Sequence, residues 1–270
     1  MTRTREFFKY FYICLILLVS YIPLFTMALF SFNKTSDKGY VSFSWNGFSW
    51  EAYRSFFSSK IMLGFVNSII IGLLASFLVV ILALLTVFSV WKQKNKYVRS
   101  FQSITNNISM INPDVIIGIS LGLFFTSAFG LLASNQEGLF RTVIGHTVMA
   151  LPFGILIMYP RSEKFSKTIF EASQDLGYSA WKTWFKTYFV YMIPSVIFTT
   201  VVTFVFSFDD FIITSITSNT ETVGTMLYQG KFRSWALALG SLLLMAMIVG
   251  NIVVYFKVAK KRALSRVGHH

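Results

Sequence analysis

Three carboxylates lie beside stretches of sequence that are otherwise almost free of charge. Asp114 stands at the start of one long apolar stretch, and Asp209 and Asp210 stand near the end of another. A carboxylate in hydrocarbon costs about 2.5–3.5 kcal/mol or more, so such residues usually face a cavity or pair with a cation. No Lys or Arg lies well inside any apolar stretch of this chain. The pattern favours a cationic passenger, or a cation from a partner subunit, received by carboxylates and aromatic faces.

Each carboxylate also has a structural interpretation, and the sequence leaves both interpretations open. Asp114 follows Pro113, which disfavours an uninterrupted helix, so Asp114 could cap a helix that begins there. Asp209 and Asp210 could instead be hydrated at the outer surface of a membrane. Because adjacent residues on a helix point in different directions, we expect at most one of this pair to line a pathway.

The chain offers little that could catalyse a reaction. It has three His and one Cys, Cys14, and lacks a His-Glu-x-x-His or Cys/His cluster of the kind that holds a metal. The segment Gly230-Lys231-Phe232 lacks the loop and the hydroxyl of a nucleotide-binding P-loop. His146 lies in an apolar stretch, where it could relay protons or simply hydrogen-bond a neighbour. We therefore expect no catalytic residue, metal or cofactor, and any ATP hydrolysis must come from a partner.

The elements that position these residues are expected to be long apolar helices. Hydrophobic residues make up 54% of the 270 residues and charged residues 13%, about half the charged share of an ordinary soluble domain. The apolar runs approach or exceed the ~20 residues that cross ~30 Å of hydrocarbon, and they do not alternate as strands would. We expect an all-α integral membrane protein with a single domain over residues 1–270. The six expected transmembrane helices are approximately 10–33, 61–91, 104–129, 142–160, 190–214 and 234–257.

The distribution of the formal net charge of +13 indicates how the helices are oriented in a membrane. Most of the 24 Lys and Arg residues fall in the segments that share a side with the N-terminus. This bias predicts that both termini are cytoplasmic. The basic residues are scattered as loop anchors and form no contiguous patch, so lipid, and not nucleic acid, is the expected anionic partner.

The segment 161–187 between the fourth and fifth spans has helical character of its own. Thr168 and Glu171 fit a capping box, with Thr168 at the N-cap. Gly177 is expected to end this short helix, because glycine tolerates the positive φ of a helix C-terminus. The residues expected to share one face of the helix are Ile169, Ala172 and Leu176.

A second short helix is expected after Gly177. It would expose Trp181, Trp184 and Phe185 beside Lys182. Two short helices joined at a glycine predict a protruding knob. The knob is either an interfacial helix that rests on lipid headgroups or a docking surface for another protein.

Residues 171–177, Glu-Ala-Ser-Gln-Asp-Leu-Gly, resemble the EAA loop of permease subunits of binding-protein-dependent ABC importers. Ser173 replaces the second Ala, and the Ile-x-Leu-Pro half of the motif is missing, although Pro194 matches a later proline of many such permeases. The resemblance implies a type I importer permease (MetI-like) fold in which this loop is the coupling helix, seated on a cytoplasmic ATPase. The coupling residues that it implies are Glu171, Ala172, Ser173, Asp175 and Gly177.

Three other segments, at 113–121, 151–153 and 207–211, resemble the polyamine (spermidine/putrescine) branch of these permeases. The resemblance implies a heterodimer with a second permease, two ATPase subunits and an extracytoplasmic polyamine-binding protein. It also implies a substrate pathway lined by Asp114, Asp209 and Asp210. One alternative is an importer of another small solute, although the lack of intramembrane cations argues against an anion. The other is an ion-driven secondary transporter, whose inverted repeats the sequence does not show.

Overall fold

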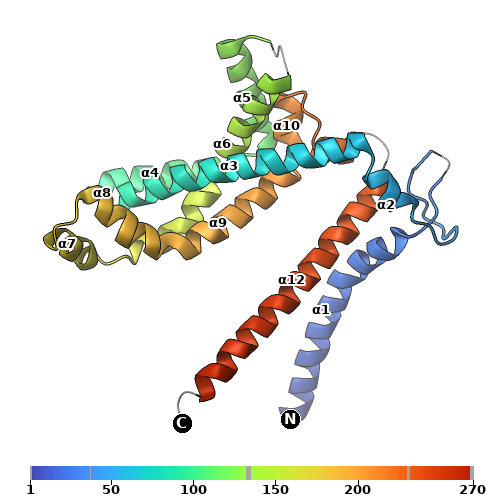
Figure 1. Ribbon diagram of the computed structural model, residues 1–270, viewed down its shortest axis with the longest axis horizontal. Coiled ribbons are helices and arrows are strands. Elements are labelled where there is room, and N and C mark those ends of the chain that lie inside the picture. The colour runs from blue at the N-terminus through green and yellow to red at the C-terminus, as the bar shows by residue number, and fades with distance from the viewer. Residues whose placement is uncertain (1, 37, 132–134, 230–231, 268–270) are drawn as a thin grey trace. The chain divides into compact units, whose positions relative to one another are not determined.

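The protein is helical throughout, as expected. The computed structural model describes residues 2–36, 38–131, 135–229 and 232–267, and within these ranges it contains no strand longer than an isolated bridge. Lys231, His269 and His270 lie outside the described residues. Within them, five helices are long and apolar enough to cross a membrane, or six if one sharply bent pair counts as a single span. The chain divides into two compact units, 1–62 with 229–270 and 63–228, which are described separately (Figure 1).

The first unit contains the N-terminal and C-terminal helices, α1 (Thr2–Phe30) and α12 (Ser234–Val267), and the short α2 (Glu51–Phe56). The hydroxyl of Tyr53 on α2 lies 2.8 Å from Ser31 Oγ, just after α1, and 2.8 Å from Ser241 Oγ on α12. This buried hydroxyl chain joins the three helices, because each group that leaves water finds a partner.

The second unit opens with α3 (Ser59–Lys92) and the bent pair α4 (Lys96–Ile111) and α5 (Asp114–Phe129). The axes of α4 and α5 differ by 101°. The expected span 104–129 is therefore bent at Pro113, the residue that disfavours an uninterrupted helix. Asn112 has an extended backbone (φ −65°, ψ 128°) because the residue before a proline is pushed out of the helical region.

The long helix α6 (Asn135–Glu163) continues beyond the expected span 142–160 at both ends. The expected span 190–214 is interrupted, because α9 (Val190–Phe208) stops before Asp209 and is followed by the short α10 (Ile212–Thr217) and α11 (Val223–Tyr228). Figure 1 shows α10 beside α5, and the two helices are in extensive contact.

The core of the second unit lies between α3, α6 and the start of α9. Tyr188, Met158 and Met192 are completely buried there. The knob is built on this core from α7 (Lys167–Asp175), α8 (Ala180–Thr183) and the π-helical turn η1 (Trp184–Phe189), which leads directly into α9.

Candidate functional site

The three carboxylates singled out in the sequence line one cavity of about 260 Å³, here called the acidic cavity. They come from different elements, since Asp114 begins α5 and the other two lie between α9 and α10. The complete lining is Asp114, Met149, Phe153, Phe206, Asp209 and Asp210. Residues about 95 positions apart in sequence are thus brought to one place by the packing of α5, α6, α9 and α10.

The acidic cavity combines negative charge with an aromatic wall. None of its lining residues within the described part of the chain is Lys or Arg. Phe153 of α6 and Phe206 of α9 pack edge to face, with ring centroids 5.1 Å apart. Carboxylates beside aromatic faces are the groups that receive alkylammonium ions, so the cavity has the chemistry expected for a cationic passenger.

Asp210 is held more tightly than its sequence context suggested. Its side chain is 7% exposed, and its Oδ2 accepts a hydrogen bond from the Thr214 backbone N–H at 3.1 Å. The same Oδ2 lies 3.1 Å from Nε2 of His146. The sequence offers no Lys or Arg to pair with these carboxylates, and Asp210 instead contacts the His146 ring and Thr214. His146 also contacts Ser207 and Thr214, in agreement with the interpretation that it hydrogen-bonds its neighbours.

Asp209 and Asp114 are more accessible. Asp209 is exposed at the C-cap of α9, so Asp209 and Asp210 do not lie on one continuous helix. Both line the acidic cavity. Asp114 is exposed in the first turn of α5, whose N-cap is Pro113, so Asp114 is not the cap itself.

Gly224 of α11 packs against the backbone of Asp209 and Asp210 and had no signal in the sequence. A Cβ atom at this position would lie 2.3 Å from the carbonyl oxygen of Asp210 and 2.6 Å from that of Asp209. Only a glycine of α11 permits this close approach. The backbone that carries both carboxylates therefore rests against α11.

The knob is the second candidate site, and its first helix starts two residues earlier than expected. The N-cap of α7 is Ser166, not Thr168, so the expected capping box with Glu171 is wrong. Phe165 is buried in the core and Ser166 is extended (ψ 127°), which places the helix start directly after the buried ring. Tertiary packing thus overrides a local capping signal.

The two faces of α7 have different surroundings. Phe170 is buried against Trp91, with ring centroids 5.5 Å apart, and Ser173 Oγ lies 3.2 Å from Thr183 Oγ1. On the other side, the apolar residues expected to share a face are exposed, with Leu176 80% exposed. Five exposed residues of α7 and its C-cap are here called the knob surface: Ile169, Glu171, Ala172, Asp175 and Leu176.

Gly177 ends α7 as the sequence predicted. Its φ is +83°, and its N–H donates to the Gln174 carbonyl at 2.8 Å. The N–H of Tyr178 donates to the Ser173 carbonyl at 3.3 Å. These two bonds form a Schellman motif, in which a glycine in the left-handed region satisfies the last carbonyls of a helix.

The second short helix of the knob is not a separate element. α8 continues through η1 into α9, so one helical run extends from Ala180 to Phe208. Trp181 and Phe185 are exposed as expected, at 73% and 56%, whereas Trp184 is half-buried. The helix that begins in the knob is therefore the same helix that ends beside the acidic cavity.

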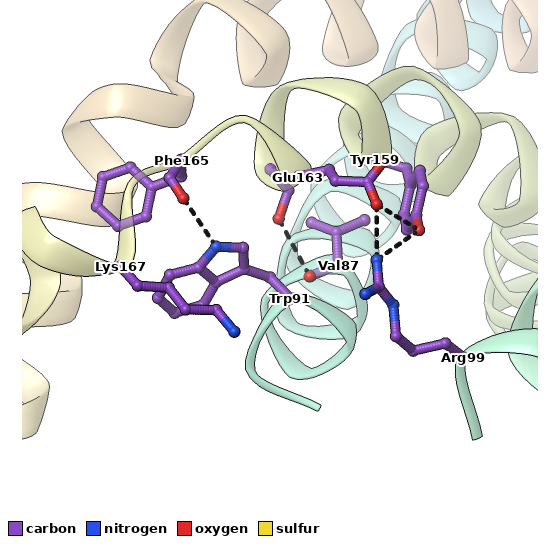
Figure 2. A pocket seen from close by; sticks show the side chains of 8 residues that line it. Val87, Trp91, Arg99, Tyr159, Glu163, Phe165 and Lys167 are labelled. Atoms are coloured by element: carbon purple, nitrogen blue, oxygen red, sulfur yellow. Dashed lines mark hydrogen bonds and ion pairs between the residues drawn. The ribbon is translucent and has the colours of Figure 1, made fainter. Parts of the chain in front are cut away.

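A polar cavity of about 240 Å³ lies beside the start of α7, as Figure 2 shows. Arg99 of α4 donates to Glu163 Oε1 at 2.6 Å and to the Tyr159 hydroxyl at 3.2 Å, which joins α4 to the end of α6 (Figure 2). Trp91 Nε1 donates to the Phe165 carbonyl at 3.0 Å. Sequence reasoning missed the ion pair between Arg99 and Glu163, because these residues are far apart in the chain.

Comparisons with known proteins identify the relatives of the chain. No family model matches it. It is 32% identical to a spermidine/putrescine transport system permease protein PotC homolog of Mycoplasma genitalium, over 93% of this chain and 90% of the relative. It is 31% identical to the PotC homolog of Mycoplasma pneumoniae, over 89% of this chain and 86% of the relative.

A solved structure supports the fold. A bacterial ABC transporter involved in the import of the acidic polysaccharide alginate contains a chain that superposes with a TM-score of 0.68. The match covers 96% of each chain at 15% identity, so it shows a shared fold. Together with the apolar helices, these matches describe a multi-pass membrane protein with the ABC importer permease fold. The chain belongs to the family of spermidine/putrescine transport permease proteins of the PotC type.

Proposed function

We propose that this chain is the permease subunit of an ATP-driven importer and that the acidic cavity binds the ammonium groups of a polyamine during transport. The observation that carries the proposal is the convergence of Asp114, Asp209 and Asp210 on one cavity without a lining Lys or Arg. The relatives are named as permeases of spermidine/putrescine transport systems, which supports the same class of passenger.

A polyamine alternates ammonium groups with methylene segments, and the lining offers contacts to both. Ammonium groups gain charge-assisted hydrogen bonds from the carboxylates, and those bonds are stronger where bulk water is excluded. Phe153 and Phe206 offer an apolar surface to the methylene segments and π faces to the cations. A sugar would leave the carboxylates without a counter-charge, and an anion would be repelled.

The knob surface is the proposed contact with the ATPase. Its exposed Ile169 and Leu176 flank Glu171, and the opposite face of α7 is fixed in the core by Phe170. A partner that moves this surface would move α9 as well, because α8, η1 and α9 are continuous. We infer that ATP binding by two ATPase subunits shifts the knob and opens the pathway toward an extracytoplasmic polyamine-binding protein.

The remaining assembly follows from this role. The chain supplies half of the pathway, and a second permease supplies the other half. Both termini face the cytoplasm, as the excess of Lys and Arg in the segments on that side indicates. The chain itself hydrolyses no ATP.

The test is uptake of radiolabelled spermidine and putrescine by the reconstituted complex, with Asp114→Asn, Asp209→Asn and Asp210→Asn. We expect each variant to raise KM while the complex still assembles. Glu51→Gln is the matched control, because it removes the same charge from an exposed residue whose side chain accepts a hydrogen bond from Thr35. Wild-type KM values in all three Asp variants would remove the acidic cavity from the pathway.

A companion measurement tests the class of passenger. ATPase activity of the complex is measured with spermidine, putrescine, a sugar and inorganic phosphate, each with its binding protein. Stimulation by the polyamines alone is expected. Stimulation by the sugar or the phosphate would contradict the assignment.

A further inference from the structure

A buried polar cluster lies directly behind the acidic cavity. His146 of α6, Ser207 of α9 and Thr214 of α10 are each at most 2% exposed. Asp210, which lines the cavity, is the fourth member. Buried polar groups are costly unless they are hydrogen-bonded, and all four have partners within the cluster. Three helices thus meet on one imidazole ring.

The contacts assign the tautomer of that ring. Nε2 of His146 lies 3.1 Å from Oδ2 of Asp210 and 2.9 Å from Oγ1 of Thr214. An ionised carboxylate can only accept, so Nε2 carries a hydrogen. Nδ1 lies 2.5 Å from Oγ of Ser207, and in the neutral ring it accepts the hydroxyl hydrogen. The carboxylate of Asp210 therefore fixes the tautomer, and the Ser207 hydroxyl, which can donate or accept, donates to Nδ1.

The two oxygens of Asp210 are consequently not equivalent. Oδ2 faces Nε2–H of His146, the Thr214 N–H at 3.1 Å and the Thr214 hydroxyl at 3.3 Å. Oδ1 has a contact with the Ile213 N–H at 3.5 Å, which is at the outer limit of a hydrogen bond. Oδ1 is thus the oxygen with capacity for an incoming donor.

We propose that His146 is a positioning residue for the passenger. Its neutral ring holds Oδ2 of Asp210 so that Oδ1 is presented to an ammonium group in the acidic cavity. This inference rests on the proposed function and adds a residue outside the cavity lining.

Two substitutions of His146 separate positioning from simple packing. His146→Gln keeps a neutral N–H donor, so its KM is expected to stay within about threefold of wild type. His146→Leu removes the donor, and KM is expected to rise about tenfold or more, as for loss of a hydrogen bond to a charged group. Maximal transport rates at saturating spermidine are expected to change far less than KM. Thr147→Val is the control, because Thr147 is buried on the same helix and its hydroxyl bonds to the Val143 carbonyl.

The assay is spermidine uptake and ATPase activity of the reconstituted complex. A wild-type KM in His146→Leu, or a KM in His146→Gln raised as far as in His146→Leu, would overturn the inference. If Asp210→Asn raises KM while both His146 variants behave as wild type, the inference alone fails. If Asp114→Asn, Asp209→Asn and Asp210→Asn are also without effect, the proposed function of the cavity fails with it.

Discussion

Replacing Gly177 by Ala tests whether the end of α7 transmits the action of the ATPase. A Cβ atom at Gly177 would meet nothing within 4 Å, so the change introduces no clash. The penalty comes from the backbone alone, because φ is +83° and a non-glycine residue in the left-handed region costs about 1–2 kcal/mol. That energy lowers the population of the ordered helix end roughly 5- to 30-fold relative to its frayed form.

The expected result is a graded loss of coupling. Gly177→Asn should be milder than Gly177→Ala, since Asn tolerates the left-handed region better. Gly177→Pro should be the most severe, because proline fixes φ near −65° and removes the N–H that bonds to Gln174. Gly250→Ala in α12 is the control, because this helical glycine also has open space and no positive φ, so the change is neutral or slightly stabilising.

Two measurements on the reconstituted complex follow these changes. Hydrogen exchange at the amides of Leu176, Gly177 and Tyr178 reports the fraying, and the number of spermidine molecules imported per ATP reports the coupling. The variants should exchange faster and import less per ATP. Faster exchange with unchanged coupling would refute the assigned role of α7, and unchanged exchange in Gly177→Ala would refute the energetic reasoning.

Three further substitutions probe other parts of the molecule. Gly224→Ala places a methyl group 2.3 Å from the carbonyl oxygen of Asp210, so the KM for spermidine should rise several-fold although no charge changes. Wild-type uptake would contradict the close packing. Arg99→Glu should lower the import rate, and the double variant Arg99→Glu/Glu163→Arg should restore it. The free energy of unfolding should change by less than about 1 kcal/mol, because the side chains of Arg99 and Glu163 are 38% and 53% exposed. Phe170→Ala removes a buried ring and should destabilise the knob by about 3–5 kcal/mol, detected as protease cleavage between α6 and α8; resistance equal to wild type would show that α7 is held elsewhere.

Much of the architecture could be predicted because a helix that spans a membrane needs a long run of apolar residues. Long uncharged runs predicted the helices, and the rarity of charge inside them drew attention to Asp114, Asp209 and Asp210. Gly177 was predictable as well, since the requirement for a positive φ at a helix end is local. The bend at Pro113 follows from the missing N–H and the restricted residue before it.

The features that were missed depend on contacts between distant residues. His146 reaches Ser207 and Thr214 across 61 and 68 positions, so no local spacing could reveal the pair with Asp210. Gly224 matters because it approaches the backbone of another segment. The start of α7 was misplaced because the buried ring of Phe165, and not the capping pattern, determines where the helix begins.

The break between α4 and α5 leaves backbone carbonyls that need hydrogen-bond donors from outside the helix. The last carbonyls of α4 have no intrahelical partner, and Asn112, Pro113 and Asp114 are exposed. Lipid cannot satisfy such groups, so at membrane depth the break must meet water or protein donors. The main chain therefore requires a polar partner, water or protein, beside Asp114. This requirement would persist if all three aspartates were replaced.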